Sequence, residues 1–238
     1  MVSASEQKRQ RPGGEMVTRP LHFIWIADCS GSMRVDGKIQ ALNTAIREAI
    51  PHMRKVAEAH DNAKMLVRAV RFSDGAYWHI AQPVPVEQFE WVDLQATGVT
   101  DMGKALELVA EQLKMPPMPE RGLPPVLVLI SDGLPTDDFA AGLNALLDLP
   151  WGKKAVRIAI AIGENANLEV LQRFINNPEL QPLQANNPEA LVTRIRWAST
   201  AVLKSASSPH SEPKGASGGG NVPIPTPPST PGGPQDVW

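Results

Sequence analysis

The sequence has 238 residues, which is enough for one full-sized domain with a single hydrophobic core and short for two. With 25 acidic and 23 basic side chains, its formal net charge is −2, so no overall basic field is available to hold a nucleic-acid backbone. The apolar runs are far shorter than the ~20 residues that a membrane-spanning helix needs. Segment 1–19 is polar and lacks the apolar run of a secretory signal. These features predict a cytoplasmic protein that binds neither nucleic acid nor membranes, and a single cysteine, Cys29, is consistent with a reducing compartment.

Short, β-rich apolar segments alternate with helical patterns along the first two hundred residues. Strands are expected at 21–28, 64–72, 76–81, 126–132 and 154–162, and helices at 39–56, 101–113, 139–149, 168–175 and 188–203. Asp74-Gly75 favours a hairpin between the second and third strands. Pro51 is expected to kink or interrupt the first helix, and 83–98 is expected to be loop. The alternation predicts a doubly wound α/β fold: a mostly parallel sheet with one antiparallel edge strand and helices on both faces.

The composition divides the chain into three parts. Residues 1–19 are expected to form a flexible segment, and residues 20–204 the α/β domain. Residues 205–238 are rich in Ser, Gly and Pro, and they hold too little apolar surface to offset the entropy of ordering them. We expect this tail to be disordered or partly polyproline II. Its last residues, Asp236, Val237 and Trp238, predict a short partner-binding motif, because Trp238 is bulky in a segment that otherwise has few large apolar residues.

The turn after the first expected strand concentrates oxygen ligands. Asp28, Ser30 and Ser32 supply one carboxylate and two hydroxyls, and Gly31 allows the backbone to fold tightly enough for them to converge. Ligands of open α/β sheets gather at the carboxyl ends of the strands. Because Mg²⁺ takes about six oxygen ligands and often keeps waters among them, this turn could supply half of a coordination shell.

Two further positions extend this pattern. Thr100 lies in Gly-Val-Thr-Asp-Met-Gly at the start of an expected helix, and Asp132 ends the strand expected at 126–132, in Ser-Asp-Gly. Together with Asp-x-Ser-Gly-Ser, this arrangement resembles the metal-ion-dependent adhesion site (MIDAS) of von Willebrand factor A (vWA) domains, over residues 21–203. The resemblance implies that Asp28, Ser30, Ser32 and Thr100 ligate Mg²⁺ or Mn²⁺ directly or through water, and that Asp132 acts through a water.

The same resemblance implies a function. In a vWA module the ion takes a carboxylate from a partner protein, so we expect a metal-dependent protein–protein interaction module. The Asp-x-Ser-Gly-Ser-Met form is similar to the bacterial branch associated with tellurium resistance and stress response. Proteins of that branch accompany a Ser/Thr protein phosphatase and a protein kinase, which are the partners that the resemblance implies.

Two alternatives stay open at this point. One is an adaptor of a ring-shaped AAA+ ATPase of the MoxR or chelatase type, in which such domains recur. The other, less favoured, is a metal-dependent hydrolase. Ser30 stands where a haloacid-dehalogenase-like site needs a second carboxylate, and the sequence has no phosphate-binding Gly-rich loop and no Gly-x-Ser-x-Gly elbow. We therefore expect no enzymatic activity.

Side chains next to these motifs are expected to have structural roles. Asp101 should cap the helix that follows it. Lys38 and Lys104 should be exposed to solvent, and Cys29 should point into the core as an unreactive thiol. Trp91, in the expected loop, is a candidate for an exposed contact surface.

Overall fold

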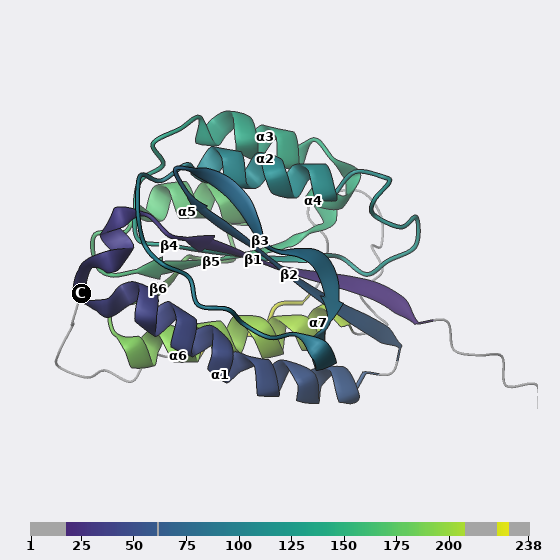
Figure 1. The fold of residues 1–238 in the computed structure, drawn as a ribbon. Helices are drawn as coiled ribbons and strands as arrows, with labels where there is room; N and C mark the ends of the chain where they lie inside the picture. Colours follow the sequence, from purple (N-terminus) through teal and green to yellow (C-terminus); the bar gives the residue numbers. More distant parts are fainter. Residues whose placement is uncertain (1–17, 61, 208–222, 229–238) are drawn as a thin grey trace, which may run out of the picture.

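A computed structural model describes residues 18–60, 62–207 and 223–228. The predicted motif Asp236, Val237 and Trp238 lies outside the described residues, as do residues 1–17. The described chain forms a six-stranded sheet in the order β3-β2-β1-β4-β5-β6 (Figure 1). The strands are β1 (Arg19–Asp28), β2 (Ala63–Ser73), β3 (Gly75–Pro85), β4 (Val126–Ser131), β5 (Val156–Ile162) and β6 (Leu183–Ala185). Only β2 and β3 pair antiparallel within this sheet, which confirms the predicted doubly wound α/β fold with one antiparallel edge strand.

Helices cover both faces of the sheet. The α-helices are α1 (Lys38–Glu58), α2 (Met102–Gln112), α3 (Phe139–Leu147), α4 (Pro150–Lys154), α5 (Leu168–Ile175), α6 (Pro188–Trp197) and α7 (Leu203–Ser207). Short 3-10 turns form η1 (Gly31–Gly37) and η2 (Val86–Gln88), and a π turn, η3 (Ala198–Val202), joins α6 to α7. Figure 1 shows α1, α6 and α7 on one face, and α2 to α5 on the other. No helix among the described residues is both long enough and apolar enough to cross a membrane.

The central strand β1 explains why its sequence reads as one continuous apolar run. Phe23 and Trp25 pack under α1 and α6, whereas Ile24 and Ile26 point to the opposite face and pack under α2. A strand of a parallel sheet that is covered on both faces needs apolar side chains at every position. The strand pairs in parallel with β2 over its whole length and ends at Asp28.

Two local predictions need correction. The helix α1 continues through Pro51 without a break, because Pro51 lies on its exposed side while the neighbouring Ile50 and Met53 hold the helix on the core. Trp91 is only 8% exposed, so it is not a surface contact. Its indole N–H donates to Oδ1 of the buried Asn43 at 3.0 Å. This hydrogen bond holds the segment between η2 and α2 against α1.

Elements too short to produce a pattern were missed. The strand β6 has three residues and α4 has five. The last helix runs to Ser207, beyond the boundary expected at residue 204, and Ala206 is fully buried in the core.

The buried histidine of β1 gives the fold a pH dependence. Burial lowers the pKa of His22 to about 4, and the positive charge of Arg68 lowers this pKa further in the same direction. Its Nδ1 is buried without a hydrogen-bond partner among the described residues. The folded protein therefore keeps His22 neutral, whereas an unfolded chain protonates it near pH 6.5.

We predict that the stability contributed by neutral His22 is complete above pH 6.5 and is lost as the pH falls toward 4. The loss amounts to roughly 3 kcal/mol, from the pKa difference between the two states. The measurement is the free energy of urea unfolding from pH 7.5 to 4, compared between the wild type and His22→Leu. Other titrating groups cancel in that difference. Parallel pH profiles for the two proteins would contradict the prediction.

Candidate metal centre

The predicted donor residues lie at the carboxyl edge of the sheet, where the strand order reverses. From β1 the chain crosses to β2 on one side, and β4 later enters on the other side of β1. The turn after β1 carries Asp28, Ser30 and Ser32, and the turn after β4 carries Asp132. This reversal point is where open α/β sheets bind their ligands.

Asp28 anchors this edge from a fully buried position. Its Oδ1 accepts a hydrogen bond from the Ser30 backbone N–H at 2.8 Å, and its Oδ2 accepts one from the Ser131 hydroxyl. Burial raises the pKa of Asp28 to about 6, although the hydrogen bonds from Ser131 and Ser30 oppose this rise. The nearby Asp132 raises the pKa further. A divalent cation at this edge would favour the ionised carboxylate and offset its burial.

The hydroxyls and the second carboxylate continue from Asp28 in one chain of contacts. Ser30 Oγ lies 2.9 Å from Ser32 Oγ, and the Ser32 hydroxyl donates to Asp132 Oδ1 at 2.6 Å. The structure therefore brings four of the five predicted donors into direct contact.

The surroundings of Gly133 show that the Thr100 hydroxyl lies close to the other donors. A Cβ built on Gly133 would lie 3.7 Å from Thr100 Oγ1 and 3.9 Å from Ser32 Oγ. Both hydroxyls thus lie within 4 Å of one position that the missing side chain leaves open. A side chain at this position would therefore lie beside the donor hydroxyls.

Lys38 belongs to this site, contrary to the prediction that it faces solvent. Its Nζ donates to Asp132 Oδ2 at 2.8 Å, and its side chain is only 15% exposed. The turn η1 explains this position, because Asp36 and Gly37 both adopt positive φ and turn the chain back so that α1 begins beside the site. The sequence gives no periodic signal for this contact. Lys38 supplies one positive charge directly to Asp132.

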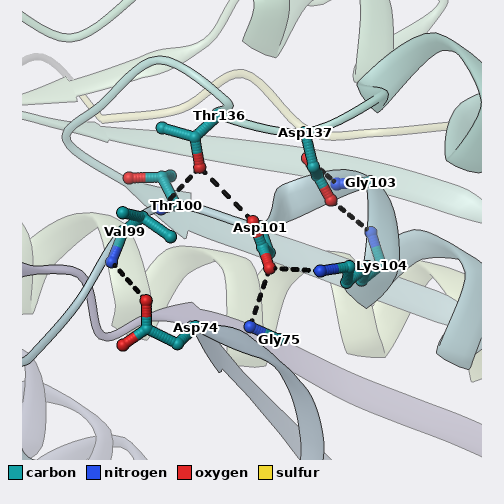
Figure 2. A network of polar contacts seen from close by, with 9 residues as sticks. All are labelled: Asp74, Gly75, Val99, Thr100, Asp101, Gly103, Lys104, Thr136 and Asp137. Atoms are coloured by element: carbon teal, nitrogen blue, oxygen red, sulfur yellow. Dashed lines mark hydrogen bonds and ion pairs between the residues drawn. The ribbon is translucent and has the colours of Figure 1, made fainter.

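Asp101 organises the loops around Thr100 and does not cap its helix. It occupies the N-cap position of α2, but its side chain accepts no hydrogen bond from the helix amides. Instead, it accepts from the Gly75 N–H at 2.8 Å and from Lys104 Nζ at 2.6 Å (Figure 2). The Lys104 contact is the main reason why the pKa of Asp101 is lowered. Lys104 is exposed as predicted, although it forms this ion pair.

The helix α2 is capped from another turn. Asp137, in the turn after β4, accepts hydrogen bonds from the N–H groups of Gly103 and Lys104, both at 2.8 Å (Figure 2). A carboxylate at a helix N-terminus satisfies free amides and complements the helix dipole. Sequence patterns reveal caps that are close in sequence, so a cap from 33 or 34 residues away was missed.

Backbone hydrogen bonds hold the Thr100 segment to the neighbouring turns. The Gly31 N–H donates to the Gly98 carbonyl at 2.9 Å. The Thr100 N–H donates to Thr136 Oγ1 at 3.0 Å (Figure 2). The Thr136 N–H donates to the Thr100 carbonyl at 2.9 Å. The Val99 N–H donates to Asp74 Oδ1 at 3.2 Å. Hydrogen bonds to the turns after β1, β2 and β4 therefore hold the Thr100 segment in place.

The donor set suits a hard divalent cation. It consists of two carboxylates and three hydroxyls, which are oxygen ligands of the kind that Mg²⁺ and Mn²⁺ take. In the described part of the chain, no group of three or more His, Cys, Asp or Glu side chains forms an alternative metal site. The adjacent Cys29 is fully buried, and burial raises the pKa of its thiol to about 12, so it is unreactive as predicted.

Solved structures with the same fold include vWA domains. The VWA2 paralog of ArnB from Sulfolobus acidocaldarius is 21% identical, with a TM-score of 0.55 over 74% of this chain and 44% of that chain. A von Willebrand factor type A protein from Catenulispora acidiphila is 16% identical, with a TM-score of 0.56 over 77% of this chain and 42% of that chain. Proximal thread matrix protein 1 from the mussel byssus, solved with a zinc-occupied MIDAS motif, is 19% identical, with a TM-score of 0.59 over 79% and 48%.

These similarities define the fold of this chain as the Rossmann-type α/β fold of vWA domains. The chain spans less than half the length of each of the three solved chains. No family model matches the sequence, and no curated protein matches it.

Replacing the Asp28 carboxylate should separate stability from metal binding. Because the pKa of Asp28 is raised in the folded protein, the stability that its neutral carboxyl group contributes is complete below pH 3.8. This stability is lost as the pH rises through about 6. At pH 7 without metal, Asp28→Asn removes the cost of the buried carboxylate charge and should raise the free energy of unfolding by up to roughly 3 kcal/mol. Added Mg²⁺ should stabilise the wild type and leave the variant unchanged. Urea unfolding in chelator and in Mg²⁺ measures both effects. A variant less stable than the wild type in chelator, or one that still gains stability from Mg²⁺, would refute this account.

A methyl group on Gly133 should block the site without disturbing the fold. Its Cβ would make ordinary van der Waals contacts, so Gly133→Ala should keep the wild-type melting temperature. Because the methyl lies among the donor hydroxyls, Mn²⁺ affinity should fall roughly ten-fold, as for other changes around metal ligands. Calorimetric titration measures this affinity, and Leu134→Ala next to it is the control. Wild-type affinity in Gly133→Ala would show that the ion does not bind there.

Proposed function

We propose that this chain is a metal-dependent protein–protein interaction module. Asp28, Ser30, Ser32 and Thr100 bind Mg²⁺ or Mn²⁺, with Asp132 acting through a water, and a carboxylate from a partner protein completes the coordination. The observation that carries the proposal is the convergence of these five oxygen donors, with the Lys38 ammonium beside Asp132.

The charges at the site support this function. Two carboxylates, one ammonium group and one divalent cation together leave a single net positive charge. One carboxylate from a partner neutralises it. An ion with few charged protein ligands stays electrophilic, which favours capture of such a group.

Exposed apolar side chains come from the same turns as the donors. Val35 in η1 is 55% exposed, Val99 beside Thr100 is 46% exposed, and Leu134 beside Asp132 is 60% exposed. Large apolar side chains gathered on an exposed surface are typical of interaction sites. We infer that the partner presents an acidic side chain flanked by apolar groups.

The arrangement supports binding better than catalysis. Among the described residues, no histidine is hydrogen-bonded to a donor residue, and His60 and His79 bond to carbonyls elsewhere. A hydrolase needs a general base within reach of a metal-bound reactant. We therefore propose that the module is not an enzyme, with a metal-dependent hydrolase as the less favoured alternative.

The finer role that we propose rests on the sequence resemblance. The module acts in the cytoplasm as an adaptor or regulator in a stress-response system similar to tellurium resistance. Its partners are a Ser/Thr protein phosphatase and a protein kinase, and the alternative partner is an AAA+ ATPase of the MoxR or chelatase type.

Co-purification from the native cell tests the proposal. Wild type, Asp28→Asn, Leu134→Ser and Met115→Ser serve as baits, each with Mg²⁺ and with chelator. Met115 is 53% exposed and lies beyond the far end of α2, so it is a matched apolar control for Leu134. We expect the partner to be lost in chelator and with Asp28→Asn, reduced several-fold with Leu134→Ser, and retained with Met115→Ser.

Two outcomes would contradict the proposal. Equal capture by all four baits, insensitive to chelator, would exclude a role for the metal. Loss with Met115→Ser but not with Leu134→Ser would place the interface elsewhere. A fifth bait that lacks Asp236, Val237 and Trp238 tests the predicted tail motif separately.

A further inference from the structure

The edge of the sheet formed by β6 borders a cavity that the metal centre does not use. Within the described residues, β6 pairs only with β5, so its other side has no neighbouring strand. A cavity of about 610 Å³ lies there, between β6, α6 and the tail residues 226–228, which form one of its walls. Its lining includes Gln184, Asn187, Arg194 and Trp197 from the domain, and Thr226 and Pro228 from the tail.

The tail segment 223–228 is packed at this cavity. Its six residues are Pro-Ile-Pro-Thr-Pro-Pro. Ile224 is half-buried against the larger hydrophobic core, and Pro227 is half-buried in the cavity lining. Arg194 of α6 donates a hydrogen bond from Nη1 to the Pro228 carbonyl. Figure 1 draws this segment in yellow.

Arg194 joins the tail to the sheet edge. Its side chain is about nine-tenths buried, and its Nε donates to the carbonyl of Gln184 in β6 at 3.3 Å. No carboxylate pairs with it among the described residues, and burial lowers its pKa. A buried guanidinium with only carbonyl partners is arranged to bind backbone acceptors.

Trp197 provides a second buried donor at the same cavity. It is 8% exposed, and its Nε1 has no hydrogen-bond partner in the part of the chain that the structure describes. Proline lacks an N–H group, so a proline-rich segment offers its receptor carbonyl acceptors and apolar rings. Its recognition therefore requires an N–H donor and an aromatic wall. Arg194 donates to the Pro228 carbonyl, and Trp197 contributes its ring to the lining of the cavity.

We propose that the surface between β6 and α6 that borders this cavity is a binding groove for an extended proline-rich segment, and that residues 223–228 lie in this groove in cis. The segment then shields the free side of β6, which would otherwise present unpaired backbone groups for association with other chains. An added proline-rich peptide must compete with this tethered ligand, whose effective concentration is high.

Competition in the full-length chain tests the proposal. The probe is a fluorescein-labelled peptide with the sequence of residues 221–230, and its binding is followed by anisotropy. Ile224→Asp removes the apolar contact and should free the groove. Pro225→Asp adds the same charge at an exposed neighbour that does not line the cavity, so it is the matched control. We expect the peptide to bind Ile224→Asp roughly ten-fold or more tightly than it binds the wild type and Pro225→Asp.

A second change identifies the groove. In the Ile224→Asp chain, Arg194→Met removes the guanidinium that donates to the Pro228 carbonyl and should weaken peptide binding several-fold. Trp197→Phe keeps the aromatic ring and removes only an N–H group that bonds to no described residue, so it should leave peptide binding nearly unchanged. Binding to no variant, or equal binding to wild type and Ile224→Asp, would overturn the proposal. Dimeric wild type that becomes monomeric with Ile224→Asp would overturn occupation in cis, because the segment would then be exchanged between two chains.

Discussion

The site depends on a carboxylate that is held out of water at the end of the central strand. Asp28 is buried because β1 is covered on both faces, so the strand carries its last residue into the interior. An isolated buried charge is costly, and hydrogen bonds from Ser131 and Ser30 offset only part of that cost. A divalent cation beside Asp28 would offset the remaining cost of the buried negative charge.

The neighbouring turns supply further charged and polar groups beside Asp28. Asp132 adds a second negative charge, and Lys38 adds one positive charge beside it. The hydroxyls that face the same space are fixed by backbone hydrogen bonds between turns, and by Asp101 and Asp137, which accept from backbone amides at the start of β3 and α2. Preorganised neutral donors can hold a cation without cancelling its charge. An ion bound among these groups would retain affinity for a further anionic ligand.

The sheet and the turns that carry the candidate donors could be predicted from the sequence because both produce local patterns. The apolar run before Asp28, the Asp74-Gly75 hairpin turn and the Ser131-Asp132-Gly133 turn each lie within a few residues. Contacts between distant turns produce no such pattern. The Lys38 contact with Asp132 spans 94 positions, and the capping of α2 by Asp137 spans more than thirty, so both needed the fold. The three-residue β6 was too short to recognise, and so the cavity beside it, which the proline-rich segment lines, was missed as well.

The central claim is that a divalent cation binds among these oxygens, and anomalous diffraction at the manganese absorption edge tests it most directly. Crystals of the full-length protein would be soaked in MnCl₂. The account predicts one strong anomalous peak beside Ser30, Ser32 and Thr100, on the side of the turns that faces Asp132. No peak there at saturating Mn²⁺, with Lys38 still bound to Asp132, would contradict it.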